Sequence, residues 1–191
     1  MTHSIQELWL IDDFSDSQRA SSAGRWQYVS DTVMGGVSQG TAEHRSVHGR
    51  PALELSGSVS LDNNGGFIQV ALDLAPDLAP DLAPDLAPDS GIAGEMLDAS
   101  AATGIAVSVC GDGGGYAINL RTGDTQRPWQ SYRHPIATSQ EWTTHYLPFS
   151  QFVAHRIERA LNPKRLRRIG LIAIGNPGAA QVALSRLALY R

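Results

Sequence analysis

Cysteine is almost absent from this sequence, which has only Cys110 among its 191 residues. An intramolecular disulfide is therefore excluded, and so is a cysteine-rich metal site. We interpret Cys110 as a small buried hydrophobic residue, because it ends an apolar stretch. A chain of this length can bury a core large enough to fold without such cross-links.

A long apolar run and an excess of positive charge are missing as well. No stretch reaches the roughly 18 apolar residues that a helix needs to cross a bilayer, so we expect no membrane insertion. The net charge is −4, and no cluster of Lys and Arg indicates nucleic-acid binding. The first residues lack the pattern of a secretory signal, and they carry Glu7, Asp12 and Asp13, unlike a transit peptide. We therefore expect a cytoplasmic protein.

The dominant pattern in the sequence is an alternation of apolar and polar residues, which is typical of β-strands. It is clearest over 105–110 and 116–121, and it continues on both sides of Gly57, where we expect a bent or bulged strand. Further strands are predicted at 8–11, 26–29, 37–43, 67–72, 129–133, 142–147, 166–174 and 181–189. About ten short strands at this spacing predict an all-β sandwich or barrel, with a helical turn or two over 150–161.

Residues 74–89 read LAPDLAPDLAPDLAPD, which is four identical copies of one tetrapeptide. A proline at every fourth position removes backbone donors and disfavours helix at the residue before it, so the repeat fits neither a helix nor a sheet. We expect an extended, solvated insertion at about 74–90, in a loop of a single domain that spans 1–191. A docking strip formed by its leucines stays open as an alternative.

Each catalytic motif in the sequence fails in its context. Residues 36–40 read GVSQG and have the form of a nucleophile elbow, but Ser38 begins an alternating stretch with no helix after it. His44 and His48 have the spacing of a zinc-binding helix, yet a glycine and a proline follow at once. We therefore predict a non-catalytic domain without a cofactor or a metal site. A structural calcium ion held by aspartates and backbone oxygens stays open.

Two glycine-containing motifs are predicted to form turns. DTVMGGVS begins at Asp31, and LDNNGGF contains Asn63. Aspartate and asparagine side chains bond to turn amides, and paired glycines allow positive φ or a close approach of two backbones. We keep Asp31 and Asn63 as a second candidate for binding. A structural role is assigned to Met34, Gly35, Gly36, Gly65, Gly66 and Phe67.

The densest aromatic and cationic segment is RPWQSYR, from Arg127 to Arg133. We predict a binding surface centred on Arg121, Arg127, Trp129, Tyr132 and Arg133. Strand alternation would put Trp129 and Arg133 on one face and Tyr132 on the other, so this surface can be split. Guanidinium groups beside an indole fit an acidic peptide or an anionic glycan.

Together these motifs resemble the complex I intermediate-associated protein 30 family, named after an assembly factor of the mitochondrial NADH:ubiquinone oxidoreductase. The resemblance is carried by DTVMGGVSQG and NNGGF, and it continues in GDGGGYAINLRT, EWTTHYLPFSQF and RLRRIGLIAIG. The RPWQSYR segment and the start of the chain are similar to the bacterial, free-standing branch of the family.

This resemblance implies a jelly-roll fold of the galactose-binding-like type, related in shape to carbohydrate-binding modules. It also implies a protein-binding accessory or chaperone-like factor, whose partners are subunits of a respiratory or other membrane-associated complex. The alternative is a module that binds a carbohydrate or a small molecule on the sandwich face or its end loops.

Overall fold

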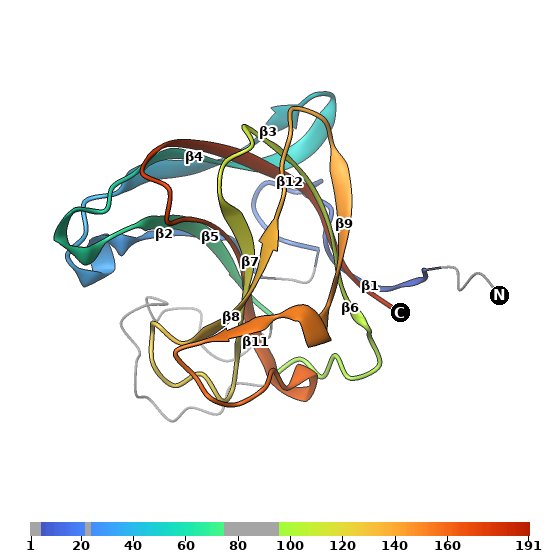
Figure 1. Ribbon diagram of the computed structural model, residues 1–191. Helices are drawn as coiled ribbons and strands as arrows, with labels where there is room; N and C mark the ends of the chain where they lie inside the picture. The colour runs from blue at the N-terminus through green and yellow to red at the C-terminus, as the bar shows by residue number, and fades with distance from the viewer. Residues whose placement is uncertain (1–4, 22–23, 75–95) are drawn as a thin grey trace.

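The computed structural model describes residues 5–21, 24–74 and 96–191. These residues form two antiparallel sheets of six strands each, which pack face to face (Figure 1). No α-helix occurs in the described ranges, where only short 3-10 helices interrupt the strands. The predicted all-β jelly-roll sandwich is confirmed. The alternating sequence pattern is its cause, because every second side chain of a strand turns toward the core.

The first sheet, sheet A, has the strand order β3-β4-β12-β6-β9, and β1 also pairs with β12. Its strands are β1 (Glu7–Asp12), β3 (Gln39–Val47), β4 (Arg50–Val59), β6 (Gly104–Gly111), β9 (Thr143–Pro148) and β12 (Gly178–Tyr190). The register of β12 against β6 shifts between Leu184 and Arg186, which marks a bulge. Before the bulge β12 pairs with β4, and after it β12 pairs with β1.

The second sheet, sheet B, has the strand order β10-β8-β7-β11-β5-β2. Its strands are β2 (Gln27–Ser30), β5 (Phe67–Asp73), β7 (Tyr116–Thr122), β8 (Ser131–Ile136), β10 (Val153–His155) and β11 (Leu166–Ile174). The 3-10 helices are η1 (Asp31–Met34), η2 (Asp62–Asn64), η3 (Phe149–Gln151) and η4 (Pro163–Arg165).

Several predicted boundaries differ from the structure. The region 150–161 holds only the end of η3 and the edge strand β10, so the helical turn expected there is confined to η3. Strand β8 begins two residues later than predicted, which leaves Trp129 in the loop before it. The bulge expected at Gly57 is wrong, because β4 pairs with β3 and β12 in unbroken register. A Cβ on Gly57 would lie 2.5 Å from the Cα of Gly40, so this glycine instead permits two strands to approach closely.

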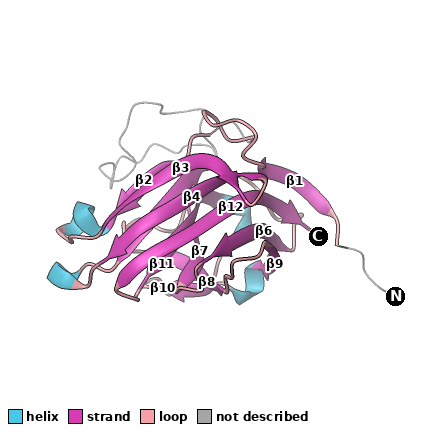
Figure 2. Cartoon of the chain, turned by 90° about the horizontal axis from the view of Figure 1, so that it is seen from above, coloured by secondary structure: helices cyan, strands magenta, loops and turns pink. Residues whose placement is uncertain are grey.

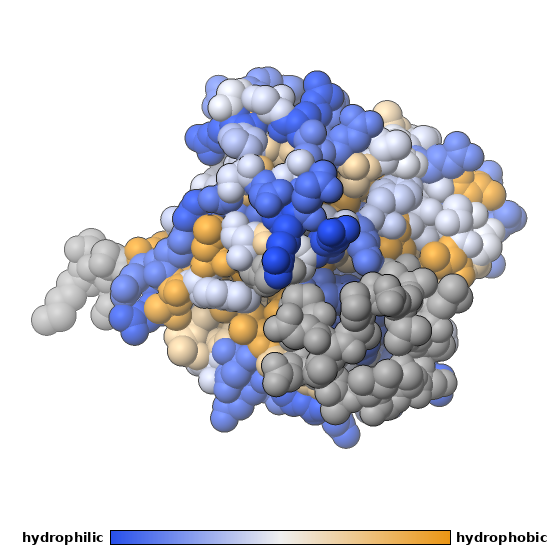
Figure 3. Space-filling model, turned by 180° about the vertical axis from the view of Figure 1, so that it is seen from behind, coloured by the Kyte–Doolittle hydropathy of each residue, from blue (hydrophilic) through white to orange (hydrophobic). Residues whose placement is uncertain are grey.

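One continuous core fills the space between the two sheets. Leu55 and Val107 of sheet A and Ile118 and Leu171 of sheet B are among its members, and each is at most 1 % exposed. On the outside, polar and apolar residues are interspersed over the described part of the face seen in Figure 3. No helix of the described residues is long and apolar enough to cross a membrane.

Of the predicted insertion, Leu74 is described, and the rest of the LAPD repeat lies outside the described residues. The described ends on either side of this segment meet at the start of β11. The Leu74 amide donates to the Arg167 carbonyl at 2.9 Å, and the Leu97 amide donates to the Leu166 carbonyl at 2.9 Å. The chain therefore leaves and re-enters the sandwich at neighbouring positions.

Candidate functional site

The motifs DTVMGGVS and NNGGF form one structural unit around the carboxylate of Asp31. This residue has no exposed surface, and its oxygens accept hydrogen bonds from the amide and the hydroxyl of Ser38, at 2.9 and 2.5 Å. The amides of Gly66 and Phe67 donate to it as well, at 2.6 and 3.2 Å. Burial would raise the pKa of Asp31, but these hydrogen bonds hold the pKa below its usual range. The carboxylate thus joins η1 to η2, at one end of the sandwich (Figure 2).

The glycines of the two motifs leave room for this carboxylate. Gly35 ends η1 in the left-handed conformation, with φ 86°. A Cβ on Gly36 would lie 2.3 Å from Cγ of Asp31, and a Cβ on Gly65 would lie 2.5 Å from Oδ2 of the same residue. Gly66 also has positive φ, at 137°. This geometry supports the structural role that the sequence predicted for the four glycines.

The same unit answers two other predictions from the sequence. Asp31 is enclosed by protein, so it cannot contact a ligand, and its candidacy for binding is wrong. Ser38 is buried and its hydroxyl bonds to Asp31, so it does not have the exposure of a nucleophile. Asn63 is exposed at the tip of η2 with φ 56°. The exposed apolar side chains at this end are Val33, Met34, Val37 and Leu61.

Of the five residues predicted to centre a binding surface, three meet at the turn before β8. The Gln130 amide donates to the Arg127 carbonyl at 3.1 Å and closes this turn, whose second position is Pro128, where proline is favoured. Trp129 follows at the third position and is 46 % exposed. A guanidinium nitrogen of Arg121 donates to the Arg127 carbonyl at 3.2 Å, so Arg121 supports the turn from β7.

Gln130 fixes this turn, although nothing in the sequence singled it out. Its Oε1 accepts from the amides of Gln126 and Arg127, at 2.9 and 3.0 Å. Its Nε2 donates to the carbonyl of Arg156 at 3.2 Å, which ties the turn to the chain after β10. These bonds hold Trp129 in place without burying it.

The remaining two predicted residues, Tyr132 and Arg133, point to opposite faces of β8. Tyr132 is fully buried, and its hydroxyl donates to the Ala160 carbonyl at 3.4 Å. It therefore cannot contact a partner, and its place in the binding surface is wrong. Arg133 is half-buried on the outer face of sheet B, opposite Asn119 of β7. Tyr132 and Arg133 thus lie on opposite faces, as strand alternation predicted, whereas Trp129 precedes the strand and lies on neither face of it.

Positive charge gathers around the turn. Arg127, Arg133 and Arg156 form no ion pair with any described carboxylate. Burial and the charge of Arg156 lower the pKa of Arg133. Burial, Arg133 and Arg156 lower the pKa of His155, the last residue of β10, which lies opposite Ser131 of β8. We define the arginine–tryptophan patch as Arg121, Arg127, Trp129, Arg133 and Arg156.

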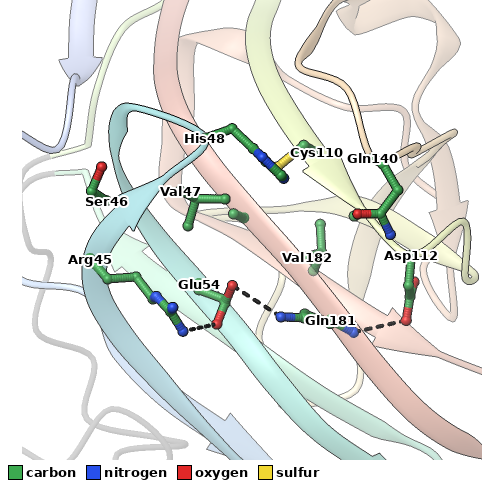
Figure 4. A pocket seen from close by; sticks show the side chains of 12 residues that line it. Arg45, Ser46, Val47, His48, Glu54, Cys110, Asp112, Gln140, Gln181 and Val182 are labelled. Atoms are coloured by element: carbon green, nitrogen blue, oxygen red, sulfur yellow. Dashed lines mark hydrogen bonds and ion pairs between the residues drawn. The ribbon is translucent and has the colours of Figure 1, made fainter.

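A groove of about 320 Å³ lies on the outer face of sheet A (Figure 4). It forms because the hairpin of β3 and β4 turns over this face. The indole nitrogen of Trp142, just before β9, donates to the Val47 carbonyl at 3.2 Å, although β3 and β9 are opposite edges of the sheet. Ala52, Ala183 and Cys110 pack beneath this bridge. Burial and the charge of Glu54 raise the pKa of the Cys110 thiol, which agrees with its interpretation as a buried hydrophobic residue.

A row of hydrogen-bonded polar side chains crosses the groove. The carboxylate of Glu54, which is only 8 % exposed, accepts from Arg45 at 3.0 Å and from Nε2 of Gln181 at 3.2 Å. The backbone amide of Gln181 donates to the carboxylate of Asp112 at 3.0 Å. His48 and Gln140 also line the groove, and their side chains form no hydrogen bond with a described residue (Figure 4). This row could not be predicted from the sequence, since its members lie on four separate segments.

The described residues contain no group of three or more His, Cys, Asp or Glu side chains placed to hold a metal ion. The arginine–tryptophan patch offers charge and an exposed indole for recognition. The groove offers hydrogen-bonding groups.

Comparison with models of known protein families shows the family of this chain. The model of the family described as Complex I intermediate-associated protein 30 (CIA30) matches residues 13–184. The chain belongs to this family. The matched range includes the Asp31 unit, the arginine–tryptophan patch and all of the residues that line the groove, so these are parts of the CIA30 domain. Among curated proteins, none matches this CIA30-family chain in sequence.

Several solved structures share the fold of this CIA30-family domain at low sequence identity. The family 11 carbohydrate-binding module of the cellulosomal cellulase Lic26A-Cel5E of Clostridium thermocellum is 14 % identical, with a TM-score of 0.65 over 98 % of this chain and 96 % of that one. The Clostridium thermocellum family 11 module in complex with a β-1,3-1,4-mixed-linked tetrasaccharide is 16 % identical, with a TM-score of 0.63 over 95 % and 94 % of the two chains. A family 29 module complexed with mannohexaose is 9 % identical, with a TM-score of 0.54 over 98 % and 92 %.

Proposed function

We propose that this CIA30-family domain is a non-catalytic, protein-binding accessory factor that acts in a chaperone-like way on subunits of a membrane-associated complex. Membership of a family named after a complex I assembly intermediate supports this role. In our proposal the arginine–tryptophan patch holds an acidic segment of the partner. A cytoplasmic location remains part of the proposal, and cell fractionation tests it.

The observation that carries this proposal is the exposed indole of Trp129 on a turn that is already fixed. Gln130 and Arg121 hold the turn through four hydrogen bonds to its backbone and to the carbonyl of Arg156. A partner therefore meets a preorganised side chain, and little conformational entropy is lost on binding. Trp and Arg are also the residues that most often dominate the binding energy of protein interfaces.

The charge of the patch indicates the chemistry of the partner. Arg127, Arg133 and Arg156 lack described acidic partners, and burial together with the repulsion between Arg133 and Arg156 lowers the pKa of Arg133. A carboxylate placed between them would relieve this repulsion and accept charge-assisted hydrogen bonds. The protein as a whole has a net charge of −4, so the patch is a local site for an anionic segment.

Substitution of two arginines tests the proposal. We expect Arg127→Ala with Arg133→Ala to keep the melting temperature, because neither guanidinium pairs with a described carboxylate, so no ion pair is lost. The same protein should capture its partner from a native lysate at least about tenfold less tightly, since two charge-assisted contacts are lost. Its remaining capture should depend less on salt than that of the wild type.

The matched control is Arg25→Ala with Arg191→Ala, which removes the same charge from residues outside the patch. Quantitative mass spectrometry of the captured proteins compares the two double variants. A partner that is lost from the patch variant and retained by the control supports the proposal. Equal capture by both variants would place the binding face elsewhere.

A second candidate function is carbohydrate binding, which the groove on sheet A favours. Two neighbours in fold were solved with a tetrasaccharide and with mannohexaose, although their identity to this chain is only 16 % and 9 %. For this chain the supporting observation is the row of polar side chains in the groove.

A further inference from the structure

We propose that the groove on the outer face of sheet A binds a neutral, polyhydroxylated ligand of one or two sugar rings, independently of the arginine–tryptophan patch. This inference rests on the second candidate function and adds its site and ligand class. Pockets for small molecules measure about 300–1,000 Å³. The groove, at about 320 Å³, has the size for a ligand at the small end of this range.

The polar groups of the groove are held in position before a ligand arrives. Glu54 bonds to Arg45 through one carboxylate oxygen and to Gln181 through the other. The backbone of Gln181 is fixed in turn by Asp112, as the dashed lines in Figure 4 show. Glu54 is nearly buried on a face that otherwise has access to solvent. A buried charge is costly unless it is paired, so the bonds of Glu54 to Arg45 and Gln181 hold the row in place.

The balance of charge in the groove favours a neutral ligand. The charge of Glu54 is compensated by Arg45, at 3.0 Å. The Asp112 carboxylate accepts hydrogen bonds from the Gly114 amide at 2.9 Å and from the Tyr116 hydroxyl at 2.8 Å, besides the bond from Gln181. An anion would meet two carboxylates here and only one guanidinium. A cation would have to compete for carboxylate oxygens that already accept hydrogen bonds.

The unused hydrogen-bonding groups of the groove suit the hydroxyl groups of a ligand. The amide of Gln140 and the imidazole of His48 each offer both donor and acceptor capacity, and neither bonds to a described residue. Both side chains extend over the groove from loops on different sides of it (Figure 4). A hydroxyl group donates and accepts at once, so several on one ring can satisfy such a mixed set. Val47, which is only partly buried, offers apolar surface in the groove for the face of that ring.

The groove and the patch lie on outward faces of different sheets, with the core between them. The groove belongs to sheet A, whereas Arg121 and Arg133 lie on sheet B. The two sites therefore share no side chain, and one can be occupied while the other is. This separation makes the failure of one proposal distinguishable from the failure of the other.

Nuclear magnetic resonance titration of the full chain tests the proposal with a fixed set of probes. The probes are glucose, galactose, mannose and their β-linked disaccharides, with glucuronic acid as the anionic counterpart. We expect at least one neutral sugar to shift the amide signals of Gly111, Asp112 and Ala183. Gln140→Ala together with His48→Ala should weaken this binding about tenfold or more, because two side-chain hydrogen bonds to the ligand are lost.

Gln39→Ala is the matched control, since Gln39 is an exposed glutamine of β3 that does not line the groove. We expect it to bind the sugar like the wild type. The proposal is overturned if no neutral probe shifts the groove amides at millimolar concentration, or if glucuronic acid binds more tightly than its neutral counterpart. It is also overturned if the control weakens binding as much as the double variant does. Partner capture through the arginine–tryptophan patch is measured separately and does not depend on this result.

Discussion

Asp31 accepts hydrogen bonds from residues 7, 35 and 36 positions further along the chain. At the scale of single residues, it explains why the most distinctive motif of the sequence contains paired glycines. Gly36 and Gly65 leave the space that the carboxylate fills, and Gly66 presents an amide to it. The paired glycines therefore serve the conformation of the two loops, and not the contacts of the exposed residues at the loop tips.

Alanine substitution separates the two ways in which these glycines act. We expect Gly35→Ala to cost about 1 kcal/mol of unfolding free energy, because only its positive φ is disfavoured. Gly36→Ala should cost more than about 2 kcal/mol, because its Cβ would displace Asp31 from charge-assisted hydrogen bonds. Chemical denaturation measures both values. Gly49→Ala is the control, since Gly49 has φ 77° and open space around it. A cost for Gly36→Ala no larger than that of the control would contradict the role given to Asp31.

Residue types alone predicted part of the candidate site. Arg127 and Trp129 were predicted from composition, because RPWQSYR is the densest aromatic and cationic segment of the sequence. Tyr132 could be excluded from the binding surface only once the start of β8 was known. A shift of one position along a strand moves a side chain from the core to the solvent. Gln130 could not be found, because its role depends on a contact with the carbonyl of a residue 26 positions away.

At the scale of elements, the alternating pattern predicted the described strands except β10, where a helical turn was expected, and the other errors fall at strand ends. A strand such as β7 is recognisable because its large apolar residues Tyr116, Ile118 and Leu120 repeat with period two. The groove could not be predicted in this way. It depends on which strands are neighbours, and on a bond between Trp142 and Val47, which are 95 residues apart.

The insertion allows a test at the same scale. Because Leu74 and Leu97 bond to adjacent residues of β11, a much shorter connection can join them. We expect deletion of residues 76–88 to change the melting temperature by no more than a few degrees, since loop-closure entropy depends only weakly on length. Differential scanning calorimetry checks this. That residues 1–191 form one domain stays a prediction, and a single cooperative transition in the same experiment would support it. A fall of ten degrees or more would show that the repeat packs against the sandwich.

At the scale of the whole molecule, the fold presents two outward sheet faces of different chemistry. On the side of sheet B, Arg127, Arg133 and Arg156 form no ion pair with a described carboxylate and lie near an exposed indole, whereas the face of sheet A carries a groove of balanced charge. A β-sandwich of this kind supports many binding functions, so the fold itself does not choose between them. The central claim is that the arginine–tryptophan patch is where a protein partner binds.

Photo-crosslinking from one position of the patch tests this claim most directly. A photoreactive amino acid replaces Trp129 in one protein and Tyr146 in another, since both residues are 46 % exposed and Tyr146 lies on β9 of the other sheet. We predict a crosslinked partner from position 129, with the adduct in a peptide rich in Asp and Glu, and no comparable product from position 146. Crosslinks from position 146 alone, or an adduct at 129 in a peptide without acidic residues, would contradict the account.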